Sequence, residues 1–411
     1  EKSTNLARIT AQIDTVAAKD IAAEVAPFAW AGALDAPMSG RIQTTLTDEG
    51  ITALDASLSF GAGALQPTPA VQPIAFDRAD MRLLYDPAQG RMTVSELSVQ
   101  SPTLRLQAEG QTYLVKADGS RMTGPLGRDV PAAYLAQLQF SQVVVDPAAL
   151  FQEPVNFSAG ALDLRLRVDP FSIEIGQLVL TEDQRRLSAK GKIAAGAAGW
   201  TVGVALGLNE IAHDRLVALW PVNLVPMTRL WVDKNVLSGA LTDVKADLQL
   251  QQGSEPQLHL SYNFANADVR FVDTLPPIEA GSGSATIEGQ TYRMVLTQGT
   301  VTPPEGGKID VATSVFSIPD VTAMPAIAEV SLHTRSSLTA ALSLLDQPPF
   351  FFMSKADLPV TLGQGTAVID TTLRLPLQPK IMIEDVEYSV KGVLSDVVST
   401  TLVPGRKLTA P

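Results

Sequence analysis

Most of the chain alternates between apolar and polar residues, which is the pattern of a strand with one buried face. Residues 162–168 read Leu-Asp-Leu-Arg-Leu-Arg-Val, so every second side chain is aliphatic and those between are charged. The same alternation recurs in residues 244–250, 258–264, 367–375 and 386–394. Strands of this kind belong to antiparallel sheets that have one apolar face and one solvated face. The chain lacks the regular alternation of strands and long helices that is typical of a parallel α/β enzyme.

Only short segments are predicted to be helical, namely residues 17–29, 213–220, 226–233 and 337–345. Each places a few apolar residues at helical spacing, and Pro226 suits the first turn of a helix. We interpret these segments as connections that cross the edge of a sheet. The sequence therefore predicts a mainly β protein, built as a long curved antiparallel β-sheet with a few short crossing helices.

Composition narrows the classes of function. The 411 residues have a net charge of −12, which disfavours the neutralisation of phosphates, so nucleic acid is not an expected partner. There is no cysteine, which removes disulfides and thiolate chemistry, and the three histidines lie far apart. No run approaches the ~18 apolar residues of a membrane span. Because the chain starts at Glu1 without a methionine, we expect it to be a piece of a longer protein.

The sequence contains no recognised catalytic motif. We find no Gly-x-Ser-x-Gly, no His-Glu-x-x-His and no calcium loop, and the segment Gly306-Gly307-Lys308 lacks the other residues of a phosphate loop. We therefore expect no enzymatic activity, no catalytic residues, no metal site and no cofactor. A β-rich glycosidase with scattered carboxylates stays open as an alternative, although aromatic residues make up only 6% of the chain.

One segment carries a resemblance to a known family. Residues 213–243 contain a Leu-x-x-x-Trp-Pro block, then an Arg-x-Trp block, an asparagine and a glycine. The matching positions are Leu216, Trp220, Pro221, Arg229, Trp231, Asn235 and Gly239. This arrangement resembles the YhdP branch of the AsmA-like family. Residues 268–287 are similar to the strand, Pro-Pro-Ile, glycine and strand module of that family, and residues 338–365 to its helix and return.

The resemblance implies a repeating β-groove protein of the Gram-negative cell envelope. Such proteins are anchored in the inner membrane, cross the periplasm and are thought to carry phospholipid toward the outer membrane. The implied partners are phospholipid acyl chains and the inner membrane, through an anchor that this chain lacks. The implied location is the periplasm. On this basis residues 1–209 form a first β-groove segment, residues 210–237 a short helical connection, and residues 238–411 a second β-groove segment.

The apolar faces of the strands supply the candidate lipid-binding residues. The apolar positions on the clearest strands are Leu164, Leu166, Leu248, Leu250, Leu260, Tyr262, Ile369, Leu373, Tyr388 and Val390. An aliphatic face suits acyl chains, which need area and no directional contacts, but it suits the core of a β-sandwich equally well. A structural or assembly protein of the envelope, with a closed β core and no lipid path, is therefore the alternative.

Two aromatic segments are open to a structural or a functional interpretation. We interpret Trp220, Pro221, Arg229 and Trp231 as a structural plug where helices cross the sheet. Phe350, Phe351 and Phe352 follow two prolines and form the most hydrophobic tip in the chain. An exposed tip would indicate contact with lipid, and a buried one would cover the open side of a sheet.

Overall fold

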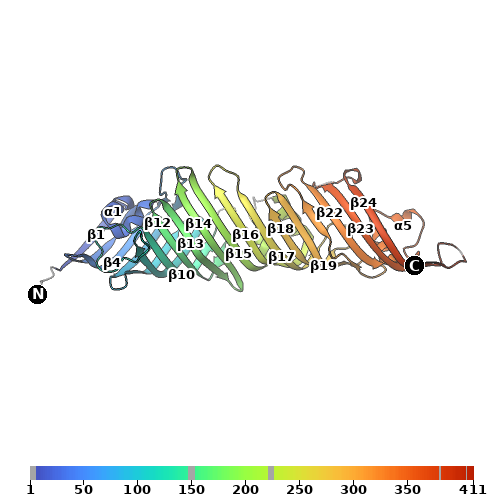
Figure 1. Cartoon of the computed structure of the whole chain (residues 1–411), viewed down its shortest axis with the longest axis horizontal. Helices are drawn as coiled ribbons and strands as arrows, with labels where there is room; N and C mark the ends of the chain where they lie inside the picture. Colours follow the sequence, from blue (N-terminus) through green and yellow to red (C-terminus); the bar gives the residue numbers. More distant parts are fainter. Residues whose placement is uncertain (1–5, 147–152, 221–225, 379–380, 404) are drawn as a thin grey trace. The chain divides into compact units, whose positions relative to one another are not determined.

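The protein is mainly β, as the sequence predicts, with antiparallel strands and a few short helices (Figure 1). The computed structural model describes residues 6–146, 153–220, 226–378, 381–403 and 405–411. Within this part of the chain, 22 strands belong to one sheet and three to a small second sheet. The chain divides into two compact units, unit 1 with Glu1–Leu208 and Asp247–Gln257, and unit 2 with Asn209–Ala246 and Leu258–Pro411. The predicted helical connection thus falls within unit 2.

Unit 1 is an antiparallel succession of long strands. They are β1 (Ala7–Ala17), β3 (Pro37–Thr47), β4 (Gly50–Phe60), β7 (Arg78–Asp86), β8 (Arg91–Gln100), β9 (Leu104–Val115), β10 (Ala133–Val145), β11 (Val155–Phe157), β12 (Ala159–Val168), β13 (Phe171–Glu182), β14 (Arg185–Gly196) and β15 (Gly199–Ala212). Each pairs with the next strand along the chain, except that β12 pairs with β10, as the short strand β11 does. The small sheet consists of β2 (Leu34–Asp35), β5 (Gly63–Leu65) and β6 (Ile74–Phe76).

Unit 2 follows the same antiparallel order. Its strands are β17 (Gln257–Val269), β18 (Ile278–Glu288), β19 (Thr291–Val301), β20 (Ile309–Asp310), β21 (Val315–Ile318), β22 (Ile327–Ser337), β23 (Gln364–Pro376), β24 (Glu387–Ser399) and β25 (Leu408–Ala410). Strand β16 (Val236–Gln251) contributes residues to both units. Pairing runs from β17 through β18, β19, β21, β22 and β23 to β24.

The helices are short, and most lie where the sequence predicts them. They are α1 (Ala18–Glu24), the 3-10 helix η1 (Ala26–Ala33), α2 (His213–Ala218), α3 (Pro226–Asn235), α4 (Leu338–Leu345), α5 (Phe352–Lys355) and the 3-10 turn η2 (Ile383–Asp385). The predicted helix over residues 17–29 is broken into α1 and η1 near Pro27. Proline has no N–H to donate and restricts the preceding residue, so an α-helix cannot continue through it.

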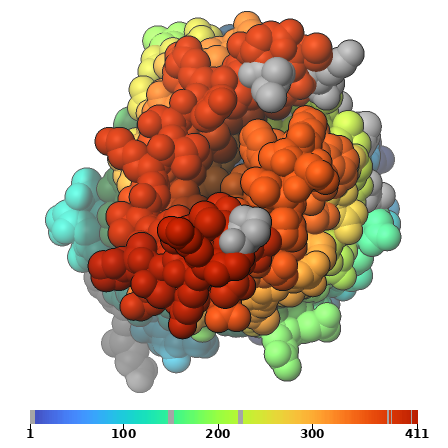
Figure 2. Space-filling view, turned by 90° about the vertical axis from the view of Figure 1, so that its right-hand side faces the viewer, coloured from blue at the N-terminus to red at the C-terminus, as the bar shows by residue number. Residues whose placement is uncertain are grey.

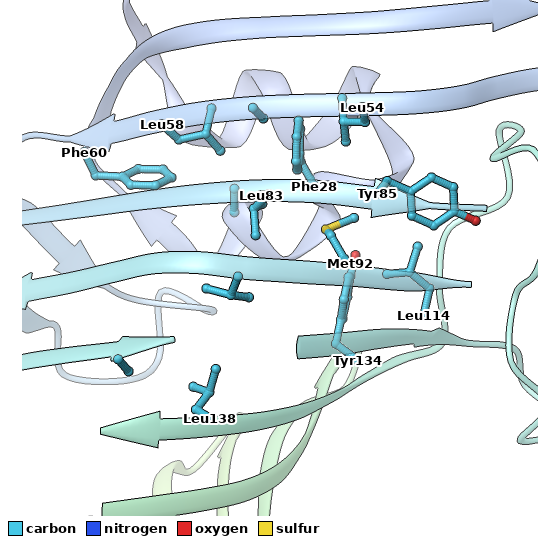
Figure 3. Close-up of a cluster of buried hydrophobic side chains, with 14 of the residues drawn as sticks. Phe28, Leu54, Leu58, Phe60, Leu83, Tyr85, Met92, Leu114, Tyr134 and Leu138 are labelled. Atoms are coloured by element: carbon cyan, nitrogen blue, oxygen red, sulfur yellow. The ribbon is translucent and has the colours of Figure 1, made fainter. Parts of the chain in front are cut away.

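The main hydrophobic core lies in unit 1, between strands and the α1–η1 segment (Figure 3). Phe28 of η1 is 1% exposed and packs in one cluster with Leu58 of β4, Leu83 of β7 and Met92 of β8. The Tyr134 hydroxyl from β10 lies within 3.5 Å of the Ala26 carbonyl oxygen. The N-terminal helical segment therefore closes over one face of the strands, which we call the inner face of unit 1.

Candidate functional site

The strand register places Leu164 and Leu166 of β12 on the inner face of unit 1. Ala136 of β10 lies opposite Leu164, Leu164 opposite Ile175 of β13, and Ile175 opposite Gly191 of β14. A neighbouring row contains Tyr134, Leu166, Ile173, Ile193 and Val202. Because opposite residues of paired strands share a face, both rows belong to the same face as the buried Tyr134.

The opposite face of unit 1, its outer face, carries charge. Glu174 of β13 accepts a 2.7 Å hydrogen bond from the Arg167 guanidinium, and Arg165 and Lys192 lie 3.8 Å from its carboxylate oxygens. These four side chains come from the three neighbouring strands β12, β13 and β14. Partly exposed pairs of this kind contribute little stability, about 0–1 kcal/mol each. Their value is that they keep this face of the sheet solvated.

Leu248 and Leu250 lie on β16, in the part of that strand that belongs to unit 1. The Gln252 backbone N–H donates to the Trp200 carbonyl at 2.9 Å, which sets β16 beside β15. Both leucines are half-buried, whereas Asp247, Gln249 and Gln251 between and beside them are exposed. This alternation gives the two leucines one face and the polar residues the other.

Part of the inner face of unit 1 is closed. Leu166 packs against the main core and against a second cluster that joins Ala33 and Val71 to Phe171. The Trp200 indole N–H donates to the Gln72 carbonyl at 2.7 Å, which holds the segment before β6 against β15. Leu166 is therefore half-buried against both clusters, whereas Leu164, also half-buried, belongs to neither.

Unit 2 has a continuous apolar row across seven strands, from β17 to β24. Its members lie opposite one another in the order Tyr262, Ala285, Met294, Phe316, Val330, Leu373 and Tyr388. We call this set the inner row of unit 2. Among them only Ala285 is fully buried, at 2% exposed. The larger side chains are half-buried, and Tyr388 is 70% exposed. Such exposure differs from that of a packed β-sandwich core.

The remaining candidate residues of unit 2 flank the inner row. Leu260 of β17 lies opposite Ile287, Ile369 opposite Gly392, and Val390 opposite Thr371. Leu260 and Ile369 are half-buried, and Val390 is 57% exposed. The structure thus brings all four candidates on β23 and β24 together on one face, next to each other. The charged Arg374 lies on the opposite face and contacts Glu387 at 3.5 Å.

Helix α4 covers only one margin of this inner face. Ala340 is fully buried and Leu344 packs against a cluster that includes Ile278, Leu296 and Val311. The Ser337 hydroxyl caps the helix by accepting from the Ala340 N–H at 3.0 Å. Figure 2 shows a hollow in the end of unit 2 that faces the viewer, between the orange and red segments. The inner face of unit 2 is therefore partly covered and partly open.

In the segment of residues 213–243, part of the pattern that carries the family resemblance holds helices α2 and α3 together. Arg229 is 7% exposed, and its guanidinium donates to the Val217 carbonyl at 3.1 Å, which joins α3 to α2. The Asn235 side chain donates to the Trp231 carbonyl at 2.9 Å, and Trp231 itself is 43% exposed. Pro221 lies outside the described residues. The structure therefore supports a joining role for Arg229.

The phenylalanine tip is exposed at its end. Phe350 and Phe352 stack with ring centroids 5.7 Å apart, and Phe352 is 56% exposed. Next to it, Met353 is buried and anchors α5. The tip is fixed to the rest of unit 2 by the Thr274 hydroxyl, which donates to the Pro348 carbonyl at 2.7 Å.

A depression of about 490 Å³ opens on the outer face of unit 1, near Tyr113, Arg121 and Arg165. The Arg121 guanidinium stacks 3.7 Å from the centre of the Tyr113 ring, which occupies one face of that ring. Asp163 and Glu174 line the depression beside the two arginines, so its charges are balanced. This mixture of acidic and basic side chains favours the binding of neither an anion nor a sugar ring.

No family model matches the chain, and neither a curated protein nor a solved structure matches it. In the described part of the chain, no group of three or more histidine and acidic side chains could hold a metal ion. Among the same residues, no helix combines the length and the apolar character needed to cross a membrane. The inner faces of the two units are therefore the candidate site.

Proposed function

We propose that this protein transports lipid, and that phospholipid acyl chains lie along the inner face of unit 2. The observation that carries this proposal is the inner row, an unbroken series of apolar residues over seven strands whose larger members are not fully buried. An apolar surface of this kind is stabilised when apolar material covers it, by about 25 cal/mol for each Å² removed from water.

An acyl chain suits this surface better than a ligand with many polar groups. Each methylene that leaves water contributes about 0.8 kcal/mol, and the contact has no preferred direction. A chain can therefore shift from one strand to the next without breaking specific bonds. The resemblance of residues 213–243 to the YhdP branch of the AsmA-like family favours the same function. It further favours a place in the periplasm, in a protein anchored to the inner membrane.

A structural role is the second candidate, and the core of unit 1 favours it. There, Phe28 and its neighbours fill the inner face, so no acyl chain could lie against Leu58 or Met92. If the inner face of unit 2 is closed in the same way, the protein is a structural or assembly component of the envelope. The two candidates differ in whether the inner face of unit 2 holds lipid.

Mass spectrometry of an organic extract tests the proposal directly. The protein is purified without detergent and extracted with chloroform and methanol, and the phospholipid found is expressed per mole of protein. We expect near-stoichiometric or greater phospholipid, because a bare apolar row would otherwise face water. As a control, the protein is unfolded in urea, refolded without lipid and extracted again. Lipid-free protein that also fails to take up phospholipid from vesicles would contradict the proposal and favour the structural role.

A further inference from the structure

Strand β24 has one free edge. Its residues Glu387 to Val398 pair with β23 on one side, while β25 pairs with Val397–Ser399 on the other. Within the described residues, the segment Glu387–Asp396 therefore has a strand neighbour on one side only. Every residue in this segment is exposed, including Tyr388 at 70%, Val390 at 57%, Val393 at 66% and Leu394 at 46%.

Natural edge strands block further pairing with prolines, charged residues such as lysine, or bulges, or they are very short. This edge has few of these features, namely Lys391 on its outer face and a register shift beside Asp396. The segment 387–396 contains no proline, and its inner-face positions are Tyr388, Val390, Gly392 and Leu394. Ten residues at about 3.3 Å each give an unpaired edge of about 33 Å. Alternate N–H and C=O groups along it point away from β23.

The outer face of the same edge has ordered charges. Arg374 of β23 lies 4.0 Å from Glu329 of β22 and 3.5 Å from Glu387 of β24, so the sign of the charge alternates across these strands. A second pair of opposite charges lies beside it, with Asp370 of β23 opposite Lys391 of β24. A further strand that continued this alternation of sign would place a cation beside Glu387 and an anion beside Lys391.

We infer that the free edge of β24 binds an extended polypeptide strand, which pairs antiparallel and continues the sheet. The geometry specifies the chemistry of this partner. It has apolar side chains opposite the inner-face positions of β24, an acidic residue opposite Lys391 and, four residues later, a basic residue opposite Glu387. Main-chain hydrogen bonds supply affinity in this mode of recognition, and the alternating side chains supply specificity. The inference does not depend on whether lipid occupies the inner row.

The chain itself contains the required pattern, in β23. Asp370 lies opposite Lys391 and Arg374 opposite Glu387, with Ile369 and Leu373 on the apolar face. A synthetic peptide with the sequence of residues 366–375 is therefore a suitable probe for the free edge. The matched control peptide has Asp370 and Arg374 exchanged, which keeps composition and β propensity but places like charges opposite each other.

The experiment measures binding of both peptides to the intact chain by isothermal titration calorimetry and by amide hydrogen exchange. We expect the matched peptide to bind about tenfold more tightly than the exchanged one, from the combined effect of two cross-strand charge pairs. Exchange should slow in residues 387–396. The double variant Glu387→Lys with Lys391→Glu should reverse the preference. Equal binding of both peptides, no binding, or protection elsewhere than residues 387–396 would each overturn the inference.

Discussion

The hydroxyl oxygens of Tyr262 and Tyr292 lie 3.0 Å apart on the inner face of unit 2. One tyrosine comes from β17 and the other from β19, with β18 between them. Tyr292 also packs edge-to-face on Phe316, with ring centroids 6.1 Å apart. The two hydroxyls form a hydrogen bond with each other within an apolar surface, since each can donate to or accept from the other.

This tyrosine pair predicts a loss of stability at alkaline pH. Burial raises the pKa of Tyr262, and burial and the neighbouring Tyr262 raise that of Tyr292, each from the ordinary value of 10.0. Above pH ~10 the unfolded chain loses these protons while the folded chain keeps them, so stability falls as pH rises, by at most about 1.4 kcal/mol per pH unit per group. Urea denaturation at pH 9, 10 and 11 measures this slope.

The matched control is the double variant Tyr262→Phe with Tyr292→Phe, which should have a shallower slope. A residual slope is expected, because burial also raises the pKa of Tyr134 in unit 1. Absorbance at 295 nm provides an independent reading of tyrosinate formation in the folded protein. If both tyrosines ionise near pH 10 before unfolding, the hydroxyl pair is not shielded from water and the prediction fails.

Placing a charge in the inner row should separate lipid binding from folding. Leu373→Asp puts a carboxylate beside Val330 and Tyr388, where acyl chains would lie. A charge in an apolar environment costs several kcal/mol unless it reaches water. Because this face is partly open, we expect the variant to fold but to retain less phospholipid. Circular dichroism melting and phospholipid content per mole measure the two effects.

Thr372→Asp is the matched control for that experiment. Thr372 is exposed, lies on the same strand and faces the opposite side of the sheet. It should change neither melting temperature nor lipid content appreciably. Leu250→Asp tests the corresponding half-buried position of unit 1. Unfolding by Leu373→Asp, with Thr372→Asp intact, would mean that the inner row is a closed core.

The side chains that share one face of a strand could be predicted from the sequence, because a strand has only two faces. Leu164 and Leu166 alternate with Arg165 and Arg167, and the register confirms that these pairs lie on opposite faces. Likewise, Leu373 and Arg374 lie on opposite faces of β23. The alternation is local, so no knowledge of distant contacts is required. Whether acyl chains occupy these faces stays a prediction.

Which residues pack over a face of the sheet could not be predicted from the sequence, because this depends on contacts between residues far apart in the chain. Tyr134 meets Ala26 across 108 positions in the sequence. Nothing in the alternation around Leu166 distinguishes it from Leu164, although the first packs against both hydrophobic clusters of unit 1 and the second belongs to neither. The four-residue helix α5 was also missed, since one helical turn is too short to show a periodicity.

Because the α1–η1 segment covers the inner face of unit 1, Phe28→Ala should lower the free energy of unfolding strongly. The side chain is 1% exposed and lies between η1 and strands β4, β7 and β8. Removal of a buried phenylalanine typically costs about 3–5 kcal/mol through lost burial and the cavity left behind. Urea denaturation measures the change, and Phe352→Ala is the control. Because Phe352 is 56% exposed, its removal should stay within about 0.5 kcal/mol.

A small effect of Phe28→Ala, comparable with that of Phe352→Ala, would have a specific meaning. It would show that the α1–η1 segment lies loosely over the strands and that the inner face of unit 1 is open to a ligand. Phospholipid content of the variant would then be the informative measurement. An increase in retained lipid would extend the proposed lipid path into unit 1.

The docking of α4 predicts different effects for two adjacent glycines. Gly306 and Gly307 have nearly the same φ, +87° and +86°, which lies in the region that favours glycine. A Cβ on Gly307 would meet open space, whereas a Cβ on Gly306 would collide with the Ala340 backbone of α4. The Ser337 hydroxyl donates to the Gly306 carbonyl at 2.7 Å, which fixes this loop against the start of the helix. Because both glycines have a positive φ, an alanine at either position carries a similar backbone cost, about 1–2 kcal/mol.

Only Gly306→Ala should carry a further cost, about 1–3 kcal/mol, because α4 must move to accommodate the new methyl group. The difference in free energy of unfolding between Gly306→Ala and Gly307→Ala isolates that contribution, since the backbone cost cancels. Displacement of α4 should also speed amide hydrogen exchange at Ala340 and Ala341, which are buried at present. Equal destabilisation by the two substitutions, with unchanged exchange in α4, would show that this helix is not held against the loop of residues 302–308. The margin of the inner face that it covers would then be open as well.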